Sequence, residues 1–183
     1  MGLNFGEDTS ENLGRLGELM LYVASKCHND RAFGATKLNK ILWMADFRAF
    51  EQLGEPLTGV RYRKQQHGPV ATSAQTVKRR LAADSAAEVL VSRYYGRKQH
   101  RLVPLREHQA GVFSQEQLDV VDDVIESLKD FTGTEASNVS HESIAWRVPQ
   151  MKAPIPYEAV FLSMPTDDEV EVARQYAKEE GWL

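Results

Sequence analysis

The sequence predicts an α+β fold that is mainly helical, a helical bundle with a small antiparallel β-sheet or hairpin. Apolar residues recur at the spacing of one buried helix face over several long segments. Two shorter segments near the middle of the chain are rich in β-branched and aromatic residues and flank a loop that contains a glycine. Glycine, proline and helix-capping residues separate these segments, so the elements can be justified in order along the chain.

The chain has 183 residues, which suits one domain, and it contains no internal repeat or low-complexity segment. We expect residues 1–9 to form a flexible N-terminus. Residues 10–183 should form a single domain that includes a C-terminal helix at about residues 166–181. A domain of this size buries about 70% of the surface of its unfolded chain, so it needs no disulfide or metal. Cys27, the one cysteine, is expected to be a small buried apolar residue.

Two packed helices are predicted at the start of the domain. The first begins at Ser10 and ends near His28, because apolar residues recur at helical spacing between them. We expect Thr36 to cap the second helix and Gly54 to end it, since glycine readily adopts the left-handed conformation that follows a helix. The apolar stripe of the second helix is wide, which indicates a largely buried helix. This stripe comprises Leu38, Ile41, Leu42, Ala45, Ala49 and Leu53, and is widened by Trp43, Phe47 and Phe50.

A turn, a strand and a third helix are expected next. Residues 55–59 contain glycine and proline and predict a turn. Residues 60–63 alternate apolar and basic side chains, as a half-buried strand does. Gly68 and Pro69 end this strand. Because proline favours the first position of a helix, residues 70–83 are predicted to be helical.

The second half of the chain predicts a hairpin and then helices. Residues 87–95 and 100–105 should be the two strands, joined by a short basic loop. Ser114 and Gln117 have the spacing of a capping box, which opens a helix through Phe131.

Shorter elements are predicted beyond this helix. Residues 134–140 favour a short helix, and residues 157–161 are a short apolar run. Thr166 and Glu169 form a second capping-box pattern, which opens the C-terminal helix. The residues of this helix expected to face inward are Val170, Ala173, Tyr176 and Ala177.

Two clusters contain residues suited to chemistry. The first surrounds His67, which could act as a general base or metal ligand at the end of a strand. The competing interpretation is a structural corner, in which Gly68 permits a sharp turn and His67 hydrogen-bonds to the main chain. The second cluster contains Ser140, His141 and Glu142, but adjacent side chains usually point in different directions and no nucleophile elbow is present.

These patterns predict no catalytic residue, no metal site and no cofactor. The histidines lack the spacing of a metal motif, and the glycines are too isolated to form a phosphate-binding loop. A hydrolase or nuclease that uses His67, His141 and Glu142 stays open as an alternative. It requires the three side chains to converge in one cleft.

The charge pattern suggests a binding surface. The formal net charge is −4, which argues against a dedicated nucleic-acid-binding protein. Basic residues nevertheless gather in the middle of the chain beside tyrosines, and arginine with tyrosine is typical of interface hot spots. No segment approaches the length of a membrane span, so we expect a cytoplasmic protein without a membrane partner. The predicted partner-binding residues are Arg61, Arg63, Tyr94 and Arg97.

Five segments in a fixed order resemble one known family. They are residues 37–46 (KLNKILWMAD), 54–59 (GEPLTG), 67–70 (HGPV), 139–146 (VSHESIAW) and 155–158 (IPYE). This set resembles the Panacea domain of SocA-like antitoxins, which was formerly described as a domain of unknown function. The resemblance covers about residues 16–162. The motif residues, expected to have structural roles, are Lys37, Leu38, Lys40, His67, Gly68, Pro69, His141, Glu142 and Trp146.

The resemblance implies a protein that binds and neutralises a cognate toxin encoded beside it. Such proteins act directly or as proteolytic adaptors that deliver the toxin to a Clp-type protease, and some are phage-associated. His67 stands where the family often has an aromatic residue, so the resemblance does not identify the toxin. A DNA-binding regulator of its own operon is a further alternative, because antitoxins often repress their own genes. We expect His67, Gly68, Pro69, His141 and Trp146 to organise the centre of the domain.

Overall fold

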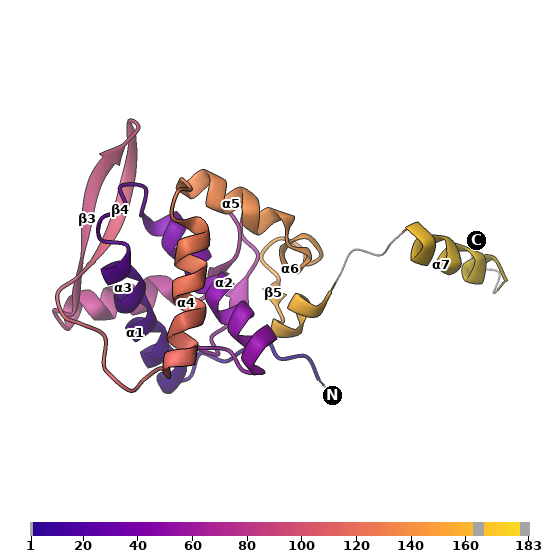
Figure 1. Cartoon of the computed structure of the whole chain (residues 1–183), viewed down its shortest axis with the longest axis horizontal. Coiled ribbons are helices and arrows are strands. Elements are labelled where there is room, and N and C mark those ends of the chain that lie inside the picture. Colours follow the sequence, from indigo (N-terminus) through magenta and orange to yellow (C-terminus); the bar gives the residue numbers. More distant parts are fainter. Residues whose placement is uncertain (1, 163–166, 180–183) are drawn as a thin grey trace.

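The computed structural model describes residues 2–162 and 167–179 and confirms a mainly helical α+β fold (Figure 1). The helices are α1 (Ser10–Lys26), α2 (Ala35–Leu53), α3 (Ala74–Ala83), α4 (Gln115–Leu128), α5 (Gly133–Glu142), α6 (Ile144–Arg147), the 3-10 helix η1 (Tyr157–Phe161) and α7 (Asp167–Glu179). The strands are β1 (Tyr62–Arg63), β2 (Val70–Ala71), β3 (Ala87–Tyr94), β4 (Arg97–Pro104) and β5 (Pro154–Ile155).

Helix α2 lies at the centre of the helical part and contacts α1, α4, α5 and η1 (Figure 1). Most of its predicted apolar stripe is buried, with Ile41 and Leu42 fully inaccessible to solvent, whereas Phe50 and Leu53 near its end are half-buried. Because helices cover this one from several sides, a single helix carries much of the hydrophobic core. Gly54 ends α2 in the left-handed conformation with φ of 82°, as predicted.

The predicted start of α2 is wrong by two residues. Gly34, in an extended conformation, is the N-cap residue, and its position offers no side-chain cap. Thr36 therefore lies inside the first turn and does not cap the helix. Glycine is suited to this position because the hairpin approaches closely: a Cβ atom on Gly34 would lie 2.7 Å from Cγ of Gln99.

The predicted start of α3 is also wrong. Val70 and Ala71 form β2, which pairs antiparallel with β1, and α3 begins at Ala74. Pro69 therefore precedes a strand and does not occupy the first position of a helix. On its other side β1 pairs with β5, so the three short strands form one sheet in the order β2-β1-β5.

Strands β3 and β4 form the predicted hairpin, but β4 begins three residues closer to the tip than expected and β3 ends one residue earlier, at Tyr94. Tyr94 pairs with Arg97, so only Tyr95 and Gly96 form the loop. Both have positive φ, 46° for Tyr95 and 76° for Gly96, as the common two-residue hairpin turn requires. The hairpin projects at one side of the helical body (Figure 1).

Helices α4 and α5 begin at well-formed caps. The capping box of Ser114 and Gln117 is confirmed, although α4 ends at Leu128, before Phe131. A capping box that we did not predict, formed by Thr132 and Glu135, opens α5. Thr166 lies outside the described residues, as do the side chains of Val170, Ala173, Tyr176 and Ala177, so the second predicted capping box and inward face stay predictions.

Residues 2–9 contain no helix or strand but contact the body of the protein. The main-chain N–H of Asn4 donates to the carboxylate of Glu158, and Asp8 accepts hydrogen bonds from the N–H of Arg61 and the hydroxyl of Ser73. Their expected flexibility in solution stays a prediction.

A buried carboxylate joins α2 to the segment that follows it. Asp46 accepts hydrogen bonds from the N–H and hydroxyl of Thr58 and from the Tyr62 hydroxyl. Burial raises the pKa of Asp46 to about 6, although these hydrogen bonds favour the carboxylate.

At the end of α1, Cys27 is 4% exposed, and burial raises the pKa of its thiol to about 11. No helix in the described part of the chain is long and apolar enough to cross a membrane.

Candidate functional site

A groove of about 700 Å³ lies between the tip of the hairpin and the first turns of α2 and α5. We call it the tip groove. Four residues that the sequence singled out line it: Tyr94, Arg97, His67 and His141. They come from three separate parts of the chain, which only the tertiary fold brings together. The tip groove is lined further by Ala32, Gly34, Ala35, Thr36, Lys37, Tyr95, Lys98, Gln99, His100, Thr132, Gly133, Thr134, Ser137 and Asn138.

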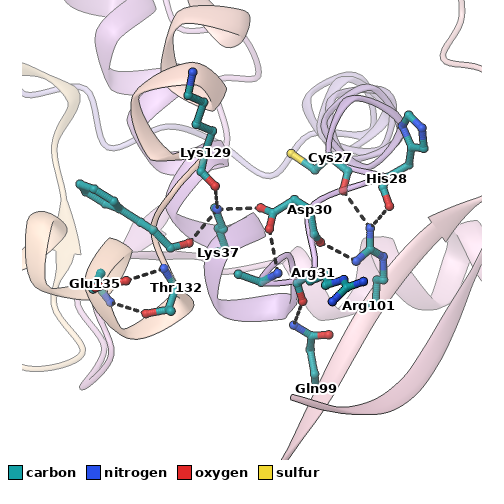
Figure 2. Close-up of polar contacts among 12 residues, drawn as sticks. Cys27, His28, Asp30, Arg31, Lys37, Gln99, Arg101, Lys129, Thr132 and Glu135 are labelled. Atoms are coloured by element: carbon teal, nitrogen blue, oxygen red, sulfur yellow. Dashed lines mark hydrogen bonds and ion pairs between the residues drawn. The ribbon is translucent and has the colours of Figure 1, made fainter. Parts of the chain in front are cut away.

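The hairpin wall of the tip groove is attached to the loop between α1 and α2 (Figure 2). The guanidinium of Arg101 donates hydrogen bonds to the carbonyl oxygens of Cys27 at 2.8 Å and Asp30 at 2.7 Å, and also to that of His28. The side-chain amide of Gln99 donates to the Arg31 carbonyl at 3.1 Å. Because carbonyls at the end of α1 lack helical partners, Arg101 satisfies groups that would otherwise need water. The middle of β4 and its part nearer the tip are therefore held against the loop between α1 and α2.

The α5 wall of the tip groove is fixed by Lys37, whose side chain is 1% exposed. Its ammonium group donates to the carboxylate of Asp30 at 2.6 Å and to the carbonyls of Phe131 at 2.7 Å and Lys129 at 3.0 Å (Figure 2). All three donors of the ammonium group are thus used. Lys37 ties the start of α2 to the loop between α1 and α2 and to the loop between α4 and α5, so the starts of α2 and α5 stay side by side.

The corner at residues 67–70 lies beside the tip groove, and His67 of this corner lines the groove. Gly68 is buried and has φ of 95°, and a Cβ atom there would lie 2.5 Å from Nζ of Lys40 and overlap the Ser140 hydroxyl. Lys40 is 1% exposed, and its ammonium group donates to the Pro69 carbonyl at 3.1 Å. Burial lowers the pKa of Lys40 to about 8. The corner is therefore a packing device built around glycine.

His67 and His141 have different environments in the tip groove. The side chain of His67 is exposed, and its main-chain carbonyl, not its ring, is tied down by the hydroxyl of Ser137 at 2.8 Å. The half-buried ring of His141 stacks on Trp146 with 3.9 Å between ring centroids. Burial lowers the pKa of His141, and the positive charge of Lys40 adds to this effect. Both effects favour the neutral form of His141, which is suited to packing.

The side chain of Trp146 is more exposed than we expected. Its ring is half-buried and covered by the ammonium group of Lys64, which lies 4.3 Å from the ring centroid, while its indole N–H donates to the Gln65 carbonyl. Of the five residues expected to organise the centre, only Gly68 and Pro69 are buried. Of the other four motif residues, Lys37, Leu38 and Lys40 are buried in α2 and Glu142 is exposed.

The proposed catalytic combination of His67, His141 and Glu142 does not form a connected site. Glu142 is exposed, and among the described residues no hydrogen bond or ion pair joins it to either histidine. Within the same part of the chain, no group of three potential ligands could hold a metal ion. The geometry of the tip groove is suited to binding.

The predicted set of four contact residues is divided between two places. Tyr94 and Arg97 lie at the hairpin tip, whereas Arg61 and Arg63 lie at β1, whose sheet is on the other side of the helical body (Figure 1). The predicted contact set left out Tyr95, although it is one of the tyrosines beside the basic residues; it is 87% exposed and packs edge-on against Tyr94 with 4.7 Å between centroids. The adjacent Tyr-Gly pair at a two-residue turn could have indicated an exposed aromatic residue.

Comparisons with known proteins were made for the whole chain. A family model described as "Antitoxin SocA-like, Panacea domain" matches residues 38–147, which is more than half of the 183 residues. The matched range includes most of α2, the hairpin and α5. A search of the curated proteins and a search of the solved structures each found no match.

Proposed function

Since the chain belongs to the family of SocA-like antitoxins with a Panacea domain, we propose that it binds and neutralises a cognate toxin and that the toxin docks on the tip groove. One observation carries the choice of surface: exposed Tyr95 and Arg97 stand beside a groove whose walls are fixed by Arg101 and Lys37. A rigid groove with an exposed aromatic residue and an arginine has the composition of an interface hot spot.

The chemistry of the tip groove favours an acidic segment of the toxin. Arg97 and Lys98 are exposed at its edge, although the chain as a whole carries a net charge of −4. The first turn of α2 faces the same space and has no side-chain cap, so its free N–H groups and positive dipole end add to the attraction. An aromatic or aliphatic side chain beside the acidic group would pack on Tyr95.

The test is co-expression with the product of the neighbouring open reading frame, measured as bacterial growth, followed by calorimetry of the purified pair. Wild-type protein should restore growth. Arg97→Glu and Tyr95→Ala should each weaken binding by about 30-fold or more, because hot-spot truncations cost about 2 kcal/mol or more. Arg63→Glu is the matched control, since it makes the same charge change on the other sheet.

The growth and binding results distinguish the possible outcomes. If wild-type protein does not restore growth, the neutralisation proposal fails. If it does, but Arg97→Glu and Tyr95→Ala bind like wild type, the toxin docks elsewhere. An equal loss in Arg63→Glu would instead support the contact set Arg61, Arg63, Tyr94 and Arg97 that the sequence suggested.

Neutralisation by direct binding and neutralisation by delivery to a Clp-type protease predict different toxin levels. Direct binding leaves the amount of toxin unchanged, whereas an adaptor shortens the toxin half-life only in cells that contain the protease. Immunoblotting of the toxin after synthesis is stopped, with and without the protease, separates the two. The alternative of a DNA-binding regulator stays a prediction, and no feature of the described residues favours it.

A further inference from the structure

Strand β3 presents an open edge to solvent. In the described part of the chain the hairpin is a two-stranded sheet, so β3 is paired only with β4. Alternate residues of an antiparallel strand direct their N–H and C=O groups toward one neighbour and the rest toward the other side. About half of the main-chain groups of β3 therefore point away from β4. The side chains of residues 88–93 are all exposed.

The exposed edge is unusually apolar for an unpaired strand. Val89, Leu90 and Val91 are 43%, 47% and 60% exposed and follow one another in sequence, so apolar side chains project from both faces. Natural edge strands are usually protected by lysine, proline or a bulge. Residues 88–92 contain no lysine and no proline, and the ladder to β4 runs without a bulge from Ala87 to Tyr94. Such an edge is suited to pairing with another strand.

The sequence of the edge is symmetric about Leu90, because a valine stands on each side of it. If β3 pairs antiparallel with β3 of a second copy about a two-fold axis at Leu90, Val89 lies opposite the partner subunit's Val91. Leu90 then lies opposite the partner subunit's Leu90. Every directly opposed pair near the axis is apolar, and such pairs stabilise a sheet.

The hydrogen-bonding pattern allows this register. In a hairpin with a two-residue loop, Tyr94 and Arg97 are a hydrogen-bonded pair, so Ser92, Leu90 and Glu88 direct their main-chain groups toward β4. Val91 and Val89 then direct theirs outward. The pairing of Val89 with the partner subunit's Val91 joins two outward-facing residues, as a ladder requires.

The charged residues of β3 favour antiparallel over parallel pairing of the two copies. Glu88 and Arg93 stand near opposite ends of β3. Antiparallel pairing places the basic end of one copy beside the acidic end of the other, whereas parallel pairing would place like charges together, which is destabilising.

We propose that the outer edge of β3 binds the same edge of a second copy of this chain, which forms a continuous four-stranded sheet across a two-fold axis at Leu90. Val89, Leu90 and Val91 do not line the tip groove, so the proposed dimer contact is centred on other residues than the proposed toxin contact. A contact of one strand pair is at the small end of the range of interface sizes, so the dimer forms reversibly as the concentration rises.

Sedimentation velocity of the full chain over about 1 to 300 µM tests the proposal, because weak interfaces associate in this range. Wild type should pass from monomer to dimer. Leu90→Lys and Leu90→Glu place like charges opposite each other at the axis and should each weaken the dimer by about tenfold or more. An equimolar mixture of the two variants should associate again, because opposite charges then face each other.

The matched control is Val148→Lys, which adds the same charge at another apolar residue that is 68% exposed. It should dimerise like wild type. Circular dichroism checks that each variant is folded. A wild type that stays monomeric at every concentration overturns the proposal, and so does an equal loss of dimer in Val148→Lys.

Cross-linking tests the register. Residues opposed in a pair without hydrogen bonds have Cα atoms about 4.5 Å apart, which a disulfide can bridge. Leu90→Cys should therefore form a disulfide-linked dimer under mild oxidation, while the native Cys27 is buried. In Glu88→Cys the two cysteines would be four residues out of register, about 13 Å apart, and should not link. Equal cross-linking of the two variants, or of neither, contradicts the two-fold axis at Leu90.

Discussion

Lys37 and Lys40 lie one turn apart on α2 and are both about 1% exposed, but their surroundings differ. The ammonium group of Lys37 binds a carboxylate and two carbonyl oxygens. That of Lys40 donates to one carbonyl oxygen, that of Pro69, and no ion pair is made by Lys40 in the described part of the chain. The same side chain at the same depth is thus fully satisfied in one place and partly satisfied in the other.

The difference separates two uses of a buried lysine. Around Lys37 the fold supplies enough acceptors to replace water, so the charge connects three segments of the chain. Around Lys40 the charge remains poorly compensated, and burial lowers the pKa to about 8. Lys40 contributes to packing, because its long side chain fills the space beside Gly68 and Ser140.

The largest effect is expected at Lys37. Lys37→Met keeps the apolar stem but leaves Asp30 and two carbonyl oxygens without their partner, and breaking a buried pair on one side costs about 3 to 5 kcal/mol. Urea unfolding followed by circular dichroism measures this loss. Lys64→Met is the control, because Lys64 also binds two carbonyls but is half-buried, and should cost about 1 kcal/mol or less. Equal losses in the two variants would show that burial does not set the difference.

The next effect is expected at the corner beside Lys40. Gly68→Ala introduces a Cβ atom 2.5 Å from Nζ of Lys40 in a backbone conformation with φ of 95°. Strain and overpacking together should lower the free energy of unfolding by about 3 kcal/mol. The double variant Gly68→Ala, Lys40→Ala should recover part of this loss, which a double-mutant cycle measures. Strict additivity would show that Lys40 does not pack against Gly68.

The smallest effect, of opposite sign, is expected at Lys40 itself. Lys40→Met removes a poorly compensated charge, so stability at pH 7 should rise by about 1 to 2 kcal/mol. The pH dependence gives a second readout. The pKa of Lys40 is about 8 in the folded protein and 10.5 is its ordinary value, so between these pH values the unfolded chain binds the extra proton.

Wild-type stability should therefore rise from pH 8 to pH 10.5 relative to that of Lys40→Met, and the difference between the two proteins should shrink. Unfolding by urea at several pH values in this window measures it. A difference that stays constant with pH would show that the pKa of Lys40 is not lowered by folding.

Features with local causes were predictable from the sequence. The capping box at Ser114 and the left-handed glycine at Gly54 depend on neighbouring residues and are confirmed. The starts of α2 and α3 were wrong because distant contacts decide them. Val70 is in a strand because it pairs with Arg63, and that sheet is completed by β5 from far along the chain.

The candidate site was predictable as a set of residues but not as a place. The sequence indicated Tyr94 and Arg97 as contact residues and His67 and His141 as structural residues, and the fold brings all four to one groove. Arg61 and Arg63 were grouped with Tyr94 and Arg97 because charge along a sequence does not show which strands become neighbours. The burial of Lys37 and Lys40 was also unforeseen from the apolar pattern, since lysine is rarely buried without partners and the partners come from other elements.

The thiol of Cys27, at the end of α1, can report local opening of the protein. Cys27 is the only thiol in the 183 residues, and its carbonyl is one of those that hold Arg101 and with it the hairpin. A protonated, covered thiol reacts with alkylating reagents only when its surroundings separate. The rate at which Cys27 is alkylated therefore measures local opening of the structure around the end of α1, and mass spectrometry can follow it without any introduced label.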